Sequence, residues 1–482
     1  MIFSRPLGLI SNLIKYSFVF VVFLNSACIS NHYERSEKFS FFWKIGRFDE
    51  AVLEAERLVE SGPRTDRMLY RLEEGTVKRI ERDFEGSIKA FQVAGDYYDE
   101  IFGIHLKSEI SISEELISTV GSVEWKTYKS RVYERVMLRL YQALNFLEVK
   151  EYGKARAEIF KTRQAVQDAR EIWKNEFEFS RKKMHSQSID LQKIVNKSKK
   201  NEFASEIEKI NQLFPSNLPD FVNPAALYLD ALYFLHQKTV SGDFEKALYS
   251  LRQLLAIHPQ NTWIREDYER SKKKMSPTGS FTYVFFETGR VPVRREKRFD
   301  LPLVFFSPMS RIPFLGITFP TLKTNENFLS GLDVYGNKNS TPVRTQLLAD
   351  MDAIVAKEFE KDFPIELAKA ISGAVTKAGL QYLGTDAIRS ESDLTRVISG
   401  VGMGTLARST TTADGRSWTT LPKQIQFGKI STPPSQRLIL CGVGTNLEII
   451  VPLESIHTNF VWVRSISTYS PLRIVSVFSL DS

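Results

Sequence analysis

Apolar residues recur at intervals of three and four along most of residues 38–275, where glycine and proline are sparse. This spacing places the apolar side chains on one face of an α-helix. We therefore predict a helical array over residues 38–275. Residues 172–210 carry many charges and no clear repeat, so we expect one or two long, exposed helices there.

Four segments of this array share one local pattern, in which a small residue stands three positions after an aromatic residue. They begin at Gly46, Arg82, Lys150 and Gly242. Each resembles the turn and second-helix start of a tetratricopeptide repeat, whose period is about 34 residues. The residues expected to pack between the paired helices are Phe48, Ala51, Phe84, Tyr152, Ala155, Phe244 and Ala247. We predict a degenerate α-solenoid, with a helical bundle that has no binding role as the alternative.

The pattern changes after residue 275 from helical spacing to short extended runs. Strand-like runs occupy residues 281–286, 425–427, 438–441, 447–451, 460–463 and 472–478. The helical spacing of apolar residues returns over residues from about 346 to 411. We predict an α+β domain over residues 276–482 with helices inserted between two groups of strands, and hence an α+β multidomain chain.

The amino terminus has the order of a secretory signal. Basic residues precede the apolar stretch Tyr16–Leu24, and small residues then lead to Cys28. A cysteine at this point resembles the lipid-attachment site of bacterial lipoproteins. We predict a signal peptide over residues 1–27, lipidation of Cys28 and a tether over residues 28–37. An ordinary secretory signal or an uncleaved anchor is the alternative, although nine residues fall short of the about 20 that span a bilayer.

Composition adds limits on compartment and partners. The 482 residues include only two cysteines, so lipidation of Cys28 leaves Cys441 without an intrachain partner, and its apolar neighbours predict a buried structural thiol. The net charge of +8 is widely spread, which favours solvated faces, with attraction to anionic headgroups as the alternative. Export and the lack of a basic-aromatic motif argue against nucleic acid. Ile29 after the cysteine favours the outer membrane over the inner.

No pattern of catalytic residues stands out in the sequence. The six histidines lack metal-site spacing, and there is no Gly-x-Ser-x-Gly elbow and no phosphate-binding loop. We therefore predict no enzyme activity, no metal and no cofactor.

Residues 413–422 contain the most specific motif, Asp414-Gly415-Arg416-Ser417-Trp418 followed by Thr-Thr-Leu-Pro. It resembles the signature of an uncharacterised family of bacterial lipoproteins. That resemblance implies a lipidated start, a repeat-like helical part and a mixed domain, together with an envelope setting near cell-wall synthesis proteins. It brings no established activity.

Two interpretations of the motif stand. In the structural one, Asp414 caps a backbone amide, Gly415 adopts a positive φ, Arg416 pairs with a carboxylate such as Asp350 or Asp352, and Trp418 fills the core. In the other, Trp418 stacks on a sugar or peptide while Arg416 holds a carboxylate. We expect a lipid-anchored envelope protein that acts as a protein-binding scaffold. A cell-wall glycan or peptide-binding module is the alternative.

Overall fold

The computed structural model describes residues 32–107, 127–186, 222–237, 240, 242–275, 279–302, 314–363, 366, 414–454 and 458–480. The predicted signal peptide and Cys28 lie outside these residues. Residues 32–37, which we expected to belong to a tether, instead form helix α2 (His32–Arg35) and the start of the next helix. The Tyr33 hydroxyl donates a 3.1 Å hydrogen bond to the carbonyl of Arg294, so this segment packs against the carboxy-terminal half.

Helices fill the amino-terminal half of the described chain. They are α3 (Glu37–Ile45), α4 (Phe48–Ser61), η1 (Arg64–Asp66), α5 (Arg67–Ile80), α6 (Phe84–Lys107), α8 (Val132–Glu148), α9 (Tyr152–Ser186), α12 (Pro224–His236), α13 (Asp243–Ile257) and α14 (Thr262–Lys272). Asn223 and Asn261 are the N-cap residues of α12 and α14. Each side chain accepts a hydrogen bond from the free backbone amides of the first turn. Of the predicted exposed helices at residues 172–210, α9 covers the first part, and residues 187–210 lie outside the described chain.

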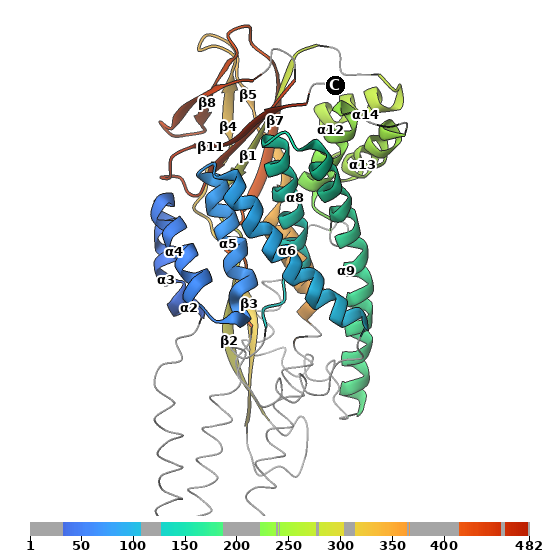
Figure 1. The fold of residues 1–482 in the computed structure, drawn as a ribbon, viewed down its shortest axis with the longest axis vertical. Coiled ribbons are helices and arrows are strands. Elements are labelled where there is room, and N and C mark those ends of the chain that lie inside the picture. Colours follow the sequence, from blue (N-terminus) through green and yellow to red (C-terminus); the bar gives the residue numbers. More distant parts are fainter. Residues whose placement is uncertain are drawn as a thin grey trace, which may run out of the picture.

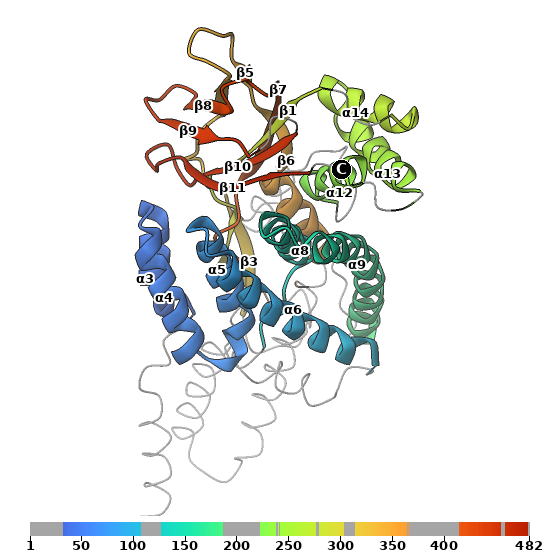
Figure 2. The same ribbon diagram turned by 45° about the horizontal axis from the view of Figure 1, so that its top comes forward.

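The helices pack as consecutive pairs: α3 with α4, α5 with α6, α8 with α9, and α12 with α13. Figure 2 shows these pairs following one another in an arc beside the sheets. The first helices of three pairs make the closest approach to the large sheet, since α5 and α8 contact β11 and α12 contacts β6. The second helices of the pairs therefore lie on the outer side of the layer.

Strands fill the carboxy-terminal half. They are β1 (Phe281–Thr288), β2 (Val293–Pro302), β3 (Phe314–Lys323), β4 (Leu332–Tyr335), β5 (Val343–Arg344), β6 (Gln346–Asp350), β7 (Gln424–Ser431), β8 (Arg437–Gly442), β9 (Glu448–Pro452), β10 (Asn459–Ser465) and β11 (Arg473–Ser479). Three sheets result, with the orders β11-β10-β1-β7-β6, β5-β4-β8-β9 and β2-β3. In the largest, β1 pairs parallel with β10 and antiparallel with β7.

The five-stranded sheet is the middle of three layers (Figure 1). Because successive side chains point to opposite faces, Tyr283 and Phe285 of β1 face the helices, whereas Val284 and Phe286 join the core shared with the four-stranded sheet. Burial on both faces explains why β1 is a continuous apolar run rather than an alternating one.

One apolar core crosses the expected boundary at residues 275–276. It unites helical residues such as Trp43 and Tyr141 with sheet residues such as Phe285 and Trp462. The mixed α+β class is confirmed. One expected helical stretch was wrong at its start, because residues 346–350 form β6, which pairs with β7, and the helix begins only at residue 351. The described part of that helix ends at residue 363, and residues 367–411 lie outside the description.

Candidate functional site

The four turns singled out in the sequence share one backbone geometry. The residue two places before each aromatic residue is left-handed, with φ of +77° at Gly46, +64° at Arg82, +61° at Lys150 and +95° at Gly242. In the first three turns, the next backbone N–H donates to the carbonyl five residues earlier, at 3.0, 2.9 and 2.8 Å. This bond satisfies a free carbonyl at the helix end, as in a Schellman motif. Similar local sequences thus make the same connection between paired helices.

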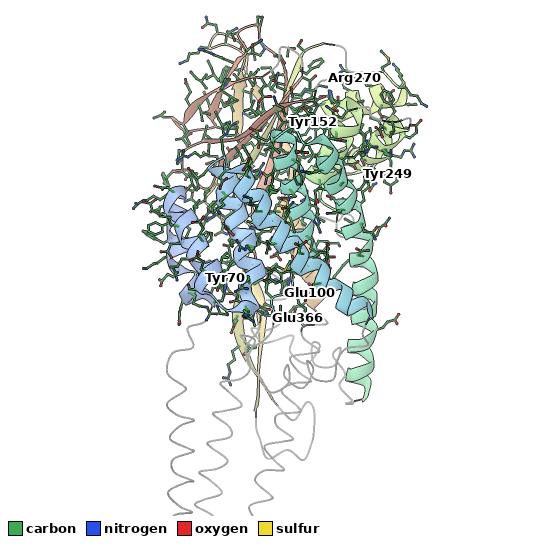
Figure 3. The ribbon with its side chains drawn as sticks, viewed as in Figure 1. Tyr70, Glu100, Tyr152, Tyr249, Arg270 and Glu366 are labelled. Atoms are coloured by element: carbon green, nitrogen blue, oxygen red, sulfur yellow. The ribbon has the colours of Figure 1, made fainter. Side chains whose placement is uncertain are left out.

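The residues predicted to pack between the paired helices are buried to different degrees. Ala51, Ala155 and Ala247 are fully buried, and so is Phe48. The aromatic residues Phe84, Tyr152 and Phe244 are half-buried, and Figure 3 labels Tyr152 at the end of the helical layer near the sheets. Burial of a small residue one turn into each second helix allows the two helices of a pair to approach closely.

The motif segment 414–423 lies between the helical layer and the five-stranded sheet. Its carboxy-terminal end extends the pairing of β7 with β1, because the Lys423 N–H donates to the carbonyl of Thr288 and the Val291 N–H donates to that of Leu421, both at 2.9 Å. The side chains of Trp418, Thr419 and Thr420 point toward α5, and the Trp418 ring also contacts α6 and α8. The segment is therefore a polar and aromatic plug between the two layers.

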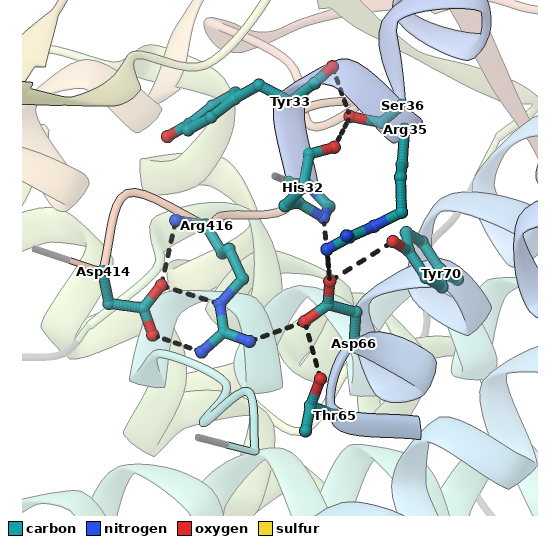
Figure 4. Close-up of polar contacts among 9 residues, drawn as sticks. All are labelled: His32, Tyr33, Arg35, Ser36, Thr65, Asp66, Tyr70, Asp414 and Arg416. Carbon is teal, nitrogen blue, oxygen red and sulfur yellow. Dashed lines mark hydrogen bonds and ion pairs between the residues drawn. The ribbon is translucent and has the colours of Figure 1, made fainter. Parts of the chain in front are cut away.

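Arg416 joins this plug to the amino-terminal helices (Figure 4). Its Nη1 lies 2.6 Å from Asp66 Oδ1, and its Nε and Nη2 donate to the two oxygens of Asp414 at 2.8 and 2.7 Å. Asp66 also faces His32 at 3.4 Å and Arg35 at 3.3 Å. Three segments that are far apart in the sequence thus meet at one carboxylate.

The pKa values of Asp66 and Arg416 both shift in the direction that favours the ionised form. Burial acts to raise the pKa of Asp66, but the His32 hydrogen bond and the Arg416 charge outweigh it and lower the pKa. Burial also acts to lower the pKa of Arg416, but Asp414 and Asp66 reverse this effect and raise it. Each buried charge therefore has the close, opposite partner that makes its burial tolerable.

Trp418 is 0% exposed. Its indole N–H is shared between Thr76 Oγ1 at 3.0 Å and Thr420 Oγ1 at 2.8 Å. The rings of Phe91 and Tyr141 meet it edge-on, at centroid distances of 5.8 and 5.9 Å. Every face of the indole is thus occupied by this chain.

Two buried glutamates of the helices hold the backbone on either side of Trp418. Glu134 accepts the Trp418 N–H at 2.8 Å. Glu73 accepts both the N–H and the hydroxyl of Thr419 at 2.8 Å, and the hydroxyl of Thr420. Burial raises the pKa of Glu73 to about 7, against the opposing effect of the hydrogen bonds from Thr420 and Thr419.

These contacts favour the structural interpretation of the motif. A ligand cannot stack on Trp418 unless the layers separate, and the Arg416 guanidinium is already paired on both sides. Asp414 does cap a backbone amide, that of Arg416, at 3.1 Å.

Two details of that interpretation were wrong. Arg416 pairs with Asp66 rather than with Asp350 or Asp352, and Asp352 pairs with Lys423. Gly415 does not have a positive φ, and a Cβ there would lie 2.1 Å from the Tyr33 hydroxyl. Close approach of α2, not backbone conformation, requires this glycine.

A second buried cluster between the layers gave no signal in the sequence. Glu287 of β1 lies 3.6 Å from Arg79 of α5 and 3.8 Å from Arg464 of β10, and it accepts a 3.1 Å hydrogen bond from Tyr141 of α8. All three charged residues are at most 2% exposed. Each of these charges stands among apolar residues in the sequence, but no sequence pattern indicates that the three side chains meet.

Three other candidate features were a metal site, a membrane-spanning helix and the Cys441 thiol. Within the described residues no group of histidine, cysteine and carboxylate side chains is arranged to hold a metal ion, and no helix among them is long and apolar enough to cross a bilayer. Cys441 is half-buried rather than buried, and burial followed by the nearby Glu448 charge raises the pKa of its thiol.

No protein family, curated protein or solved structure matches this chain. The resemblance of the motif to a lipoprotein family therefore stays a prediction.

Proposed function

We propose that this chain is a lipid-anchored protein of the bacterial cell envelope, placed in the outer membrane, whose helical layer binds other proteins. Its partners would be envelope proteins, including those of cell-wall synthesis, and it would perform no catalysis and need no cofactor. The carboxy-terminal sheets would serve as a platform that holds the helical layer in one shape.

The observation that carries this proposal is the repetition of one helix–turn–helix unit whose second helices each have an exposed apolar residue. Each second helix carries an exposed apolar residue: Leu53, Val93, Phe160 and Tyr249. Leu53 and Tyr249 occupy the same position, five residues after the turn aromatic, and are 65% and 59% exposed. Arrays of paired helices commonly present such extended surfaces to partners, and exposed apolar groups mark interaction sites when they gather on one surface.

The anchor is tested by the full-length Cys28→Ala variant. We expect this variant to leave the membrane fraction after export, since it lacks the lipidated thiol. If it stays in the membrane after a salt wash, the lipid anchor is refuted.

The scaffold is tested by single surface changes rather than by deleting helices, because the helices share their core with the sheets. Partners captured with the full chain from membranes should be lost on Leu53→Glu or Tyr249→Glu. The matched control is Ile450→Glu, which changes an apolar residue of β9 that is 53% exposed. Loss of partners only with the control would refute a helical docking surface and favour binding by the carboxy-terminal sheets.

A further inference from the structure

A polar pocket opens between the second and third helix pairs. It has a volume of about 300 Å³ and is lined by Gln92, Asp96 and Asp99 of α6, Arg139 and Gln142 of α8, and Glu158 and Lys161 of α9. Pockets that hold small groups begin at about this size. Arg139 and Gln142 of α8 are buried and form its floor, whereas Asp96 and Asp99 of α6 are exposed and form its rim.

The cations of the pocket are already engaged. Arg139 pairs with Glu158 at 3.2 Å and with Asp99 at 3.4 Å, and Lys161 pairs with Glu158 at 2.8 Å. Gly95 permits this arrangement, because the Arg139 Nη1 would lie only 3.1 Å from a Cβ at that position. An incoming anion would have to displace these ion pairs.

The acceptors of the pocket are not all engaged. Gln142 is 2% exposed, and its Oε1 receives no hydrogen bond within the described chain. The amide orientation is fixed, since Nε2 donates to the Ile88 carbonyl at 3.3 Å and a carbonyl can only accept. A buried carbonyl without a donor is unfavourable, so this site calls for an N–H group.

The rim of the pocket also offers hydrogen-bond acceptors without a full set of partners. Asp96 forms no ion pair in the part of the chain that the structure describes, and Asp99 keeps 62% of its side chain exposed. Three carboxylates face two cationic groups, which leaves the pocket with one net negative charge. A guanidinium group carries several N–H donors in one plane and matches carboxylates well.

We propose that this pocket receives the cationic side chain of a partner protein, an arginine, with its N–H groups directed to Gln142 Oε1 and to the carboxylates of Asp96 and Asp99. The proposal rests on the proposed docking function and specifies one contact of it. The arginine would supply the donor that the floor lacks and the positive charge that the rim lacks.

The test uses the full chain in detergent and a fluorescein-labelled peptide, acetyl-Gly-Arg-Gly-lysine-amide carrying the dye on lysine, with binding read by anisotropy. Citrulline replaces arginine in the matched peptide, because it keeps the shape and loses the charge. We expect saturable binding of the arginine peptide that weakens with salt, and much weaker binding of the citrulline peptide.

Two variants of lining residues and one control variant test the location of the site. Asp96→Asn, at the exposed rim, should weaken binding about tenfold by removing one charge-assisted hydrogen bond. Glu85→Gln, an exposed change of equal charge elsewhere on α6, should leave affinity unchanged. Gln142→Leu should also weaken binding, provided that its circular dichroism and melting temperature match those of the wild type.

The experiments distinguish failure of the pocket proposal from failure of the proposed docking function. Equal binding of both peptides, or no effect of Asp96→Asn, would overturn the pocket proposal. If the arginine peptide does not bind but Leu53→Glu still loses partners, the docking function stands without this contact. If the peptide binds as expected but no surface variant affects capture, the pocket stands and the docking function fails.

Discussion

Replacement of Trp418 by alanine should destabilise the whole molecule, because this side chain ties the helical layer to the sheets. The change removes a fully buried indole, its shared hydrogen bond to two threonine hydroxyls and its edge-on contacts with two rings. Truncating a buried tryptophan to alanine costs ~3–5 kcal/mol. Each aromatic pair adds ~0.5–1.5 kcal/mol beyond burial, so we expect a loss near the upper end of that range.

The phenylalanine variant separates packing from hydrogen bonding. Trp418→Phe keeps a ring between the helices and keeps the backbone N–H that binds Glu134. It loses the indole N–H, which contributes ~1 kcal/mol, and part of the ring volume. We expect it to cost about half as much as the alanine variant.

Urea denaturation followed by far-ultraviolet circular dichroism measures the free energies of unfolding. Hydrogen exchange read by mass spectrometry then tests the coupling, since peptides from α5 and α8 should lose protection together with peptides from β7 and β10. A cost below ~1 kcal/mol for Trp418→Ala, or loss of protection in one layer alone, would refute the argument that the plug joins the layers.

Three further predictions concern the Asp66 ion pairs, the buried Glu73 and two glycines of the helices. Asp66→Asn removes one of the two carboxylates that pair with the buried Arg416 and should cost ~2–4 kcal/mol. Adding Arg416→Met should then cost less than it does in the wild type, and an additive double-mutant cycle would contradict this link. The raised pKa of Glu73 means that its stabilising contribution is complete below about pH 4.5 and is lost as the pH rises through about 7. The stability of the wild type relative to Glu73→Gln should therefore fall between about pH 4.5 and 7, by up to ~3 kcal/mol, and a flat difference would refute the assignment. Gly75→Ala should cost ~1–3 kcal/mol, because its Cβ would lie 2.5 Å from a phenyl ring of α6. Gly153→Ala, with nothing within 4 Å, should instead stabilise α9 by ~0.5–1 kcal/mol, and equal effects would contradict the steric reason.

Local features of this chain follow from local sequence. The four turns could be located because an aromatic residue and a small residue three positions later recur, and each turn is closed by nearby backbone groups. The strands β1, β7, β8, β9, β10 and β11 could be predicted from apolar runs between turn residues. The short strands β4 and β5 lack such runs, and residues 346–350 read as helix because their apolar residues continue the spacing of the helix that follows.

Partners distant in the sequence could not be predicted in the same way. Nothing near Arg416 distinguishes Asp66, which lies 350 residues away, from the closer acidic residues first considered. Which carboxylate a guanidinium meets depends on how whole elements pack, and that packing is set by the apolar faces of the helices and of the sheet. For the same reason, the contacts of Glu287 with Arg79 and Arg464 could not be predicted from the sequence.

The sequence by itself determined the helical first half, the stranded second half and the repeated turns, because hydrophobic period and turn chemistry act over a few residues. The tertiary structure alone decided that the two halves share one core. It also decided that Trp418 is a buried plug rather than an exposed ligand contact, and that a polar pocket opens between α6, α8 and α9. Burial and ion pairing depend on which surfaces come together in space, and a linear pattern does not specify this.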